Sequence, residues 1–182
     1  AEALHTVEAE FGRPQWVFGM STYAFVSPHE IVCAYCEQGM WRLARLDTAS
    51  GEFEPIDTPF TDIDEVRGGP GFAVFRAASP MTPRQIVRLD VDTLALRPLR
   101  PAPPLAIDAA DVSLPQAIAY PTEGGAMAYA YYYPPCNRRF AAPEGELPPL
   151  IVSEVRFCIW PMIFGRRPSR SSCGAQSCTL RI

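Results

Sequence analysis

Short runs of alternating apolar and polar residues fill the first hundred positions, and each run ends in a turn signal. Four such runs cover residues 23–27, 30–37, 40–47 and 52–57. The pairs Ser27-Pro28, Gln38-Gly39 and Ser50-Gly51 separate them. Alternation with a period of two is typical of strands that have one buried face, and such pairs favour tight turns. The pattern predicts a four-stranded antiparallel sheet.

Alternation within residues 40–47 predicts which side chains share a face. Trp41, Leu43 and Arg45 fall on one side of this strand. Arg42, Ala44 and Leu46 fall on the other.

A sequence repeat links this unit to the next. Arg45-Leu46-Asp47 matches Arg88-Leu89-Asp90, and Pro55 matches Pro98, with an offset of 43 residues in each case. The second unit supplies strands at residues 72–79, 84–90 and 94–99. A period of about 40–50 residues with several short strands per unit indicates β-propeller blades. The alternative is a chance similarity between two hairpins of another all-β fold.

The pattern changes after residue 100. Residues 101–115 are rich in proline and predict a stiff linker. Residues 116–135 predict a β-hairpin that turns at residues 122–125, followed by a polar loop and the apolar strand 148–152. We therefore expect blades in residues 1–100 and the start of an α/β domain in residues 116–152. Two blades alone leave sheet faces exposed, so the unit is expected to be part of something larger.

Composition narrows the class of protein. The chain has 182 residues, of which 48% are hydrophobic and 20% charged, which indicates a globular protein. Its net charge of −4 argues against nucleic-acid partners. No apolar run is long enough to cross a membrane, and the N-terminal residues lack the pattern of a signal peptide. We expect a cytoplasmic protein with six reduced cysteines.

Candidate nucleophiles and bases are few. Ser21 lies in Gly19-Met20-Ser21-Thr22-Tyr23, which has tyrosine where a serine nucleophile elbow needs its second glycine. The two histidines, His5 and His29, lie in polar segments and are expected to face solvent. Ser21 is therefore not expected to be a nucleophile.

Cysteines, aromatic residues and carboxylates allow alternative interpretations. Cys33 and Cys36 form a CxxC pattern, but they lie in a strand and no second ligand pair accompanies them, so a structural role is favoured over a metal or redox site. Trp16, Phe18, Tyr23 and Phe25 are expected to pack into a core rather than line a pocket. The acidic residues at 62–65 and 144–149 are expected in solvated loops.

Four stretches of sequence resemble one family. Residues 10–25, 36–47, 59–63 and 120–152 resemble the bacterial branch of the prolyl oligopeptidase family of serine peptidases, whose members include dipeptidyl aminopeptidases and acylaminoacyl-peptidases. The resemblance implies the end of an N-terminal β-propeller followed by the first strands of an α/β-hydrolase domain. It also implies peptide substrates for the full-length members.

After residue 152 the sequence departs from the pattern of this family. The family continues from the matching strand into a His-Gly-Gly-Pro segment that helps to form the oxyanion hole. Here the sequence reads Ser153-Glu154-Val155-Arg156-Phe157. No catalytic residue of the family maps onto this chain. We therefore expect no catalytic, cofactor-binding or metal-ligating residue and no cofactor.

Residues 153–182 differ in composition from the rest. They hold five arginines, three cysteines, five serines and one acidic residue. This favours an aberrant, frameshifted tail, and the alternative is a divergent insertion. Sequencing the downstream DNA tests the frameshift, which requires another reading frame to restore His-Gly-Gly-Pro. The sequence thus predicts a mainly β, inactive fragment of a peptidase, with a non-catalytic binding or assembly module as the alternative and self-association through exposed edge strands.

Overall fold

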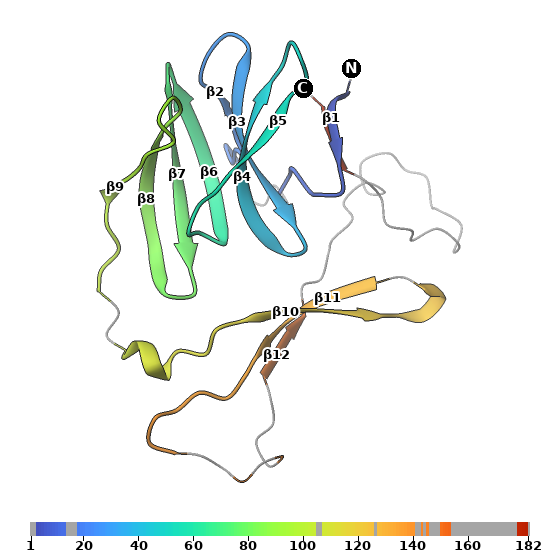
Figure 1. Ribbon diagram of the computed structural model, residues 1–182, viewed down its shortest axis with the longest axis vertical. Coiled ribbons are helices and arrows are strands. Elements are labelled where there is room, and N and C mark those ends of the chain that lie inside the picture. Colours follow the sequence, from blue (N-terminus) through green and yellow to red (C-terminus); the bar gives the residue numbers. More distant parts are fainter. Residues whose placement is uncertain are drawn as a thin grey trace.

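The computed structural model describes residues 3–13, 18–104, 107–125, 127–140, 143, 145, 150–153 and 178–181. Within these residues the chain is mainly β. It forms two four-stranded sheets, a three-stranded sheet and a two-stranded sheet (Figure 1). Consecutive strands pair antiparallel throughout the two four-stranded sheets.

The first four-stranded sheet follows the predicted order. Its strands are β2 (Tyr23–Phe25), β3 (Glu30–Glu37), β4 (Met40–Asp47) and β5 (Phe53–Ile56). β3 and β4 have the predicted bounds. Gln38 and Gly39 between them have φ angles of 50° and 86°, as a two-residue hairpin turn of type I′ requires.

The second four-stranded sheet contains one strand more than the sequence predicted. Its strands are β6 (Asp62–Gly69), β7 (Phe72–Ser79), β8 (Thr82–Asp90) and β9 (Leu96–Arg100). The expectation of a solvated loop at residues 62–65 is wrong, because Ile63 and Asp64 are buried in β6. A bulge between Asp64 and Arg67 breaks the alternation that would have indicated this strand.

The repeat extends to the register of the strands. Leu46 pairs with Phe53 across β4 and β5, and Leu89 pairs with Leu96 across β8 and β9. Each pair is related to the other by the same 43-residue offset. The two sheets are therefore equivalent units, consistent with propeller blades.

The main core lies between the two sheets, which stack face to face (Figure 1). Leu43 of β4 is completely buried there, and Trp41 packs against the same cluster. The remaining buried residues of this cluster come from both sheets: Val26, Val32, Ala34, Ile56, Phe60, Ile63, Val66, Ala73, Phe75, Ala77, Val87, Leu89 and Val91. The predicted division of β4 into two faces is confirmed, because Ala44 and Leu46 belong to a different cluster.

That second cluster covers the other face of the first sheet. Residues 4–11 pack over it and bury Ala9 and Phe11 against β3 and β4. Glu10 and Cys36 exchange two backbone hydrogen bonds, of 2.9 and 2.8 Å, which tie this segment to the edge of β3. The N-terminal segment therefore closes a face that a single sheet would leave exposed.

His5 belongs to this covering segment, in β1 (Ala3–Val7). The expectation that His5 faces solvent is wrong. Its ring stacks on that of Phe53, with centroids 4.6 Å apart and planes 9° apart, and the residue is half-buried. The polar residues around His5 do not indicate this contact in the sequence, because the partner Phe53 lies 48 positions away. His29 is exposed, as predicted.

The prediction that the aromatic residues before β3 pack into a core is wrong for those that the structure describes. Phe18 is fully exposed, and Tyr23 and Phe25 have 38% and 47% of their surface exposed. On the edge strand β2, Tyr23 pairs with Cys33 and Phe25 pairs with Ile31. Cys33 and Ile31 are buried beneath residues 4–11, whereas Tyr23 and Phe25 lie outside this cover and stay exposed. Trp16 lies outside the described residues.

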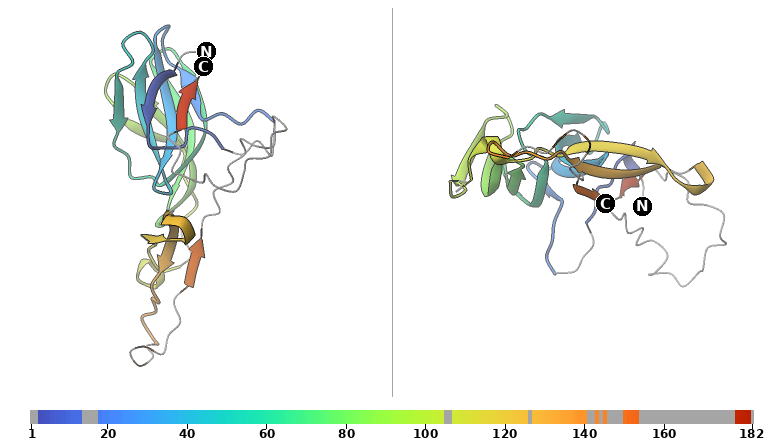
Figure 2. Two further views of the ribbon diagram at one scale, coloured as in Figure 1. Left: turned by 90° about the vertical axis from the view of Figure 1, so that its right-hand side faces the viewer. Right: turned by 90° about the horizontal axis from the view of Figure 1, so that it is seen from below.

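The predicted hairpin is present in the three-stranded sheet. β10 (Gln116–Pro121) pairs with β11 (Met127–Tyr133), and β12 (Leu150–Ser153) pairs antiparallel with β11 on its other side. The 3-10 turn η2 (Glu123–Gly125) joins the hairpin, with φ of 75° at Gly124 and 79° at Gly125. This sheet lies beyond one end of the stacked sheets (Figure 2).

Two contacts attach this sheet to the rest of the chain. The hydroxyl of Tyr131 donates a hydrogen bond to the carbonyl oxygen of Gly39 in the β3–β4 turn. The 3-10 turn η1 (Ala109–Asp111) lies in the predicted linker, and Arg138 makes ion pairs of 2.8 Å with Asp108 and 3.2 Å with Asp111. The linker is therefore fastened to the loop that follows the hairpin.

Four residues near the C-terminus form a strand beside the N-terminal segment. β13 (Cys178–Arg181) pairs antiparallel with β1. The predicted aberrant tail lies largely outside the described residues, as does most of the acidic segment at 144–149. Neither of the short helical turns in the described part of the chain has the length or the apolar character to cross a membrane.

Candidate functional site

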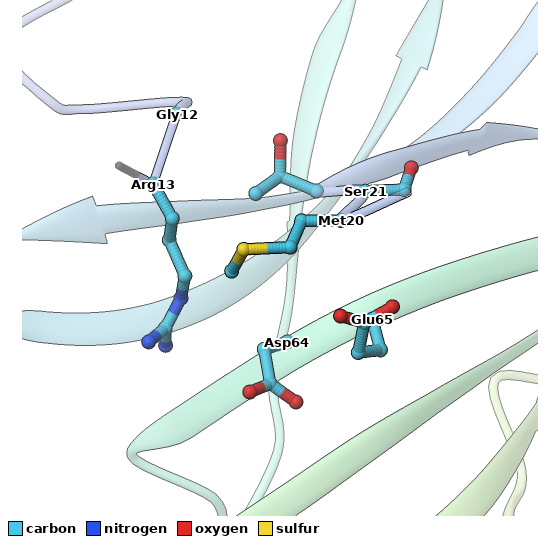
Figure 3. A pocket seen from close by; sticks show the side chains of 7 residues that line it. Gly12, Arg13, Met20, Ser21, Asp64 and Glu65 are labelled. Atoms are coloured by element: carbon cyan, nitrogen blue, oxygen red, sulfur yellow. The ribbon is translucent and has the colours of Figure 1, made fainter. Parts of the chain in front are cut away.

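A small hollow opens where the edge strands β2 and β6 lie near each other (Figure 3). Two of its lining residues, Asp64 and Glu65, are carboxylates on β6, and Arg13 reaches it from the N-terminal segment. The other lining residues are Gly12, Met20, Ser21 and Thr22. Three charged side chains from two distant parts of the sequence thus border one space.

Asp64 is the buried polar residue of this region, with 6% of its surface exposed. Its two carboxylate oxygens each accept a hydrogen bond of 2.8 Å from Arg76, one from Nε and one from an Nη atom. This two-point geometry is the strongest that arginine and a carboxylate can form. It satisfies the carboxylate and holds β6 against β7.

Asp62, two residues earlier on the same strand, receives two arginines. Arg13 donates to one of its oxygens at 2.7 Å and Arg84 to the other at 2.6 Å. Burial alone would raise the pKa of Asp62, but the hydrogen bonds from Arg84 and Arg13 outweigh it and hold that pKa below its ordinary value. Asp62 is therefore ionised at neutral pH.

Arg13 links the hollow to the core. Its guanidinium lies over the Trp41 ring, 4.0 Å from the centroid, and also donates to the carbonyl oxygen of Ile63 at 3.1 Å. Its Nε is buried and has no hydrogen-bond partner among the described residues. Arg13 thus fixes the N-terminal segment beside β6.

Glu65 occupies the bulge of β6 with a φ angle of 54°. A non-glycine residue in this left-handed region is uncommon and is held there by its surroundings. Arg67 donates to the Glu65 carboxylate at 2.9 Å, and the N–H of Val66 donates to the carbonyl oxygen of Ser21 at 2.9 Å. The bulge turns Val66 into the core and leaves Glu65 at the rim of the hollow.

The hollow is small and does not form a catalytic centre. Its volume of about 60 Å³ accepts a few water molecules and no peptide residue. The hydroxyl of Ser21 donates to the carbonyl oxygen of Tyr23 at 2.6 Å. His29 lies in the β2–β3 turn, where its carbonyl oxygen accepts from Thr48, and His5 stacks on Phe53. The structure does not bring Ser21 together with either histidine.

The two cysteines of the CxxC pattern lie in the strand β3 and form no disulfide bond among the described residues. Cys33 pairs with Ala44 and packs in the cluster beneath residues 4–11, whereas Cys36 pairs with Trp41. Burial raises the pKa of Cys33 to about 12, which keeps its thiol protonated and unreactive at neutral pH. Among the described residues no group of three or more His, Cys, Asp and Glu side chains is placed to hold a metal ion.

A second hollow lies on the first sheet, around Arg45. The guanidinium makes ion pairs with Glu54 and, at 3.2 Å, with Glu30. Asp47 and Glu52 complete the lining. Four carboxylates therefore surround one arginine, which leaves this part of the surface acidic.

Sequence reasoning missed the arginine–aspartate contacts of the first hollow. The usable signal was the spacing of Asp62 and Asp64, which places both carboxylates on one face of a strand. No local pattern could have paired Asp64 with Arg76 or Asp62 with Arg13, because those partners lie in other elements.

Known structures match the chain, whereas no protein-family model and no curated protein matches it. A puromycin-hydrolyzing peptidase of Mycobacterium tuberculosis superposes with a TM-score of 0.72 and 28% identity, over 81% of this chain. A puromycin hydrolase superposes with a TM-score of 0.70 and 31% identity, over 80% of this chain. The same hydrolase in a complex gives a TM-score of 0.71. This chain is homologous to one region of the prolyl oligopeptidase-family peptidases.

The resemblance inferred from the sequence is thereby confirmed. The chain spans 22% of the length of each of these peptidases. Among the described residues, neither His5 nor His29 is placed beside Ser21 as a catalytic base would be.

Proposed function

We propose that the chain is part of a prolyl oligopeptidase-family serine peptidase that hydrolyses peptides, of the aminopeptidase or acylaminoacyl-peptidase type. In this proposal the two four-stranded sheets are the end of a β-propeller, residues 101–115 are the linker, and residues 116–152 begin the α/β-hydrolase domain. The structural match to two puromycin-hydrolysing enzymes is the observation that supports it.

The role of the sheets in this proposal follows from their architecture. Blades of a propeller that precedes a catalytic domain control which substrates reach the active site. The edge strands β2 and β6 lie near each other, as the inner strands of neighbouring blades do. The hollow beside them, bordered by Asp64, Glu65 and Arg13, would then face the path of the substrate.

The 182-residue chain alone is proposed to be inactive. Acyl transfer by a serine peptidase needs a nucleophile next to a base and donors for the oxyanion. Ser21 donates its hydroxyl to a backbone oxygen of its own segment, and both histidines are engaged or placed elsewhere. Loss of even one triad member lowers the rate by orders of magnitude.

Hydrolysis assays on the purified chain test this proposal. Puromycin is the first substrate, because the matched enzymes are named for its hydrolysis, and an aminoacyl-nitroanilide is the second. We expect release of product at the uncatalysed rate only. Turnover that is abolished by a serine-directed phosphonate would contradict the inactivity. A Ser21→Ala variant that loses such turnover would identify Ser21 as the nucleophile after all.

A non-catalytic binding or assembly module is the second candidate function. It is favoured by the exposed aromatic residues Phe18, Tyr23 and Phe25, since neighbouring exposed aromatic side chains are typical of protein contacts. A saturable interaction with a purified partner that the triple Phe18→Ser, Tyr23→Ser, Phe25→Ser variant loses, in the absence of hydrolysis, would support this function. Retention of the interaction by that variant would count against it.

A further inference from the structure

The backbone pairing of the β10–β11 hairpin stops where prolines begin. At the open end of the hairpin the terminal register pair is Gln116 with Tyr132. Pro115 directly precedes β10, and Pro134 and Pro135 directly follow β11. Proline has no N–H to donate, so the backbone ladder does not continue through these positions. Contacts beyond this point must therefore come from side chains.

Two side chains continue the pairing past these prolines. The hydroxyl of Ser113 in the linker donates a hydrogen bond to the carbonyl oxygen of Pro134 at 2.5 Å. The thiol of Cys136 donates in the opposite direction, to the carbonyl oxygen of Ala110 at 3.0 Å. The linker before β10 and the loop after β11 thus run beside each other in the same antiparallel sense as the two strands.

Arg138 makes the strongest contact between these two segments. Its backbone N–H donates to one carboxylate oxygen of Asp111 at 2.9 Å, and its Nη and Nε atoms donate to the other oxygen at 3.2 and 3.4 Å. Its second Nη atom lies 2.8 Å from a carboxylate oxygen of Asp108. Asp108 also caps η1, because its carboxylate accepts from the N–H of Ala110 at 2.9 Å. One guanidinium therefore binds both ends of a three-residue turn that is too short to be stable alone.

The linker upstream of Asp108 differs from this part. Pro101, Pro103 and Pro104 have no N–H, and Ile107 is 60% exposed. Residues 101–104 and 107 form no hydrogen bond or ion pair with the described part of the chain. The predicted linker 101–115 therefore divides at Asp108 into an unattached part and a part that is bound to the loop after the hairpin.

We propose that Arg138 is a conformational lock that makes residues 108–113 part of the hairpin, so that the linker bends upstream of Asp108. With the lock closed, residues 108–113 and 134–138 move together with β10 and β11. With the lock open, the free linker extends as far as Gln116. The three charged side chains are partly exposed, so the lock weakens as the ionic strength rises. It does not depend on the proposed function, because both of its sides lie in the described chain.

Hydrogen–deuterium exchange of the purified chain, followed by mass spectrometry, tests the lock. In the unmodified chain we expect the amides of residues 110–112 to exchange more slowly than the amide of Ile107. Arg138→Leu should accelerate exchange at residues 110–112 by about fivefold to tenfold, because charge-assisted hydrogen bonds are lost. It should leave the exchange of β3 and β4 unchanged. An unchanged rate at residues 110–112 would overturn the proposal, since the stiffness of the prolines alone would then order this segment.

Arg139→Leu is the matched control for the loss of an arginine. Arg139 follows Arg138 in the same loop, is exposed, and its side chain forms no ion pair within the described residues. This variant should exchange as the unmodified chain does. Equal acceleration by Arg138→Leu and Arg139→Leu would show a response to net charge and contradict the assignment to Arg138.

Salt and a double variant separate a lock of this kind from a general loss of stability. Exchange at residues 110–112 should accelerate between about 20 mM and about 0.5 M salt in the unmodified chain and stay constant in Arg138→Leu. Asp111→Asn combined with Arg138→Leu should exchange little faster than either single variant, because both changes remove the same contact. A salt response that survives in Arg138→Leu, or effects of the two changes that multiply, would overturn the proposal.

Discussion

Arg76 on β7 forms a bidentate ion pair with Asp64 on β6, with both hydrogen bonds at 2.8 Å. The two partners differ in burial: the Asp64 side chain is 8% exposed and the Arg76 side chain is 43% exposed. The cost of breaking the pair therefore depends on which partner is removed. A carboxylate left alone in a buried position loses more than an arginine that can turn to water.

We expect Arg76→Leu to lower the free energy of unfolding by about 2–3 kcal/mol and Asp64→Asn by about 1 kcal/mol. Urea denaturation followed by circular dichroism measures both. Arg42→Leu is the control, because its ion pair with Glu37 is about half exposed on both sides and should contribute less than about 0.5 kcal/mol. Equal losses for Arg76→Leu and Asp64→Asn would contradict the assigned asymmetry.

Gly68 brings β6 close to β2. A Cβ atom at this position would lie 2.7 Å from the carbonyl oxygen of Phe25 and 2.9 Å from the Cβ of Ala24. We expect Gly68→Ala to cost about 1–3 kcal/mol, because two strands would have to separate. Gly12→Ala is the control, since a Cβ there meets nothing within 4 Å. The melting temperatures of the two variants check this, and a Gly68→Ala protein as stable as the Gly12→Ala protein would show that the strands yield freely.

The thiol of Cys33 makes stability depend on pH in the alkaline range. Its pKa is about 12 in the folded chain against 9.0 for the unperturbed thiol. Above pH 9 the unfolded state releases a proton that the folded state retains, so ionisation favours unfolding and stability falls as the pH rises towards 12. Below pH 9 both states keep the proton and this contribution is constant.

Unfolding by urea at several pH values between 8 and 11 measures this effect, which can reach about 1.4 kcal/mol per pH unit. The curve of Cys33→Ala should be flatter than that of the unmodified chain over this range. Cys136→Ala is the control for the loss of a thiol, because Cys136 is exposed. Parallel curves for Cys33→Ala and the unmodified chain would refute the role of burial.

The contact of Tyr131 with Gly39 should protect the hairpin from local opening. Tyr131→Phe removes the hydroxyl that donates to the Gly39 carbonyl oxygen. A hydrogen bond of about 1 kcal/mol corresponds to a roughly fivefold faster exchange of the amide protons of β11. Hydrogen–deuterium exchange with mass spectrometry detects this. Tyr133→Phe serves as the control on the same strand, because the Tyr133 hydroxyl has no hydrogen bond among the described residues, and it should leave the exchange rates unchanged.

Strands that alternate cleanly between two turns were predictable from the sequence. The bounds of β3 and β4 follow from the Gln38-Gly39 turn and from the regular apolar alternation of the residues on either side of it. The repeat of Leu46 at Leu89 likewise predicted equivalent strand pairs, and the register bears it out. Where the local period and the tertiary environment agree, sequence reasoning succeeds.

Elements that depend on distant partners were not predictable. The strand β6 carries three acidic residues and a bulge, so its polar character outweighed Ile63 and Val66 in the sequence pattern. Asp64 is buried because Arg76 neutralises it, and no local rule supplies that partner. The stacking of His5 on Phe53 and the exposure of Phe25 both depend on which part of the first sheet residues 4–11 cover.

The shared register of the two sheets gives the chain a natural unit of length. Joining Arg45 directly to the residue after Arg88 would delete one whole period of 43 residues and keep every later side chain on its own side of the strand. A deletion of 42 residues would turn the following strand over and place Leu89 on the face that carries Arg45. An insertion or deletion in such a repeat is therefore expected to preserve the faces of the strands when its length is one whole period of 43 residues.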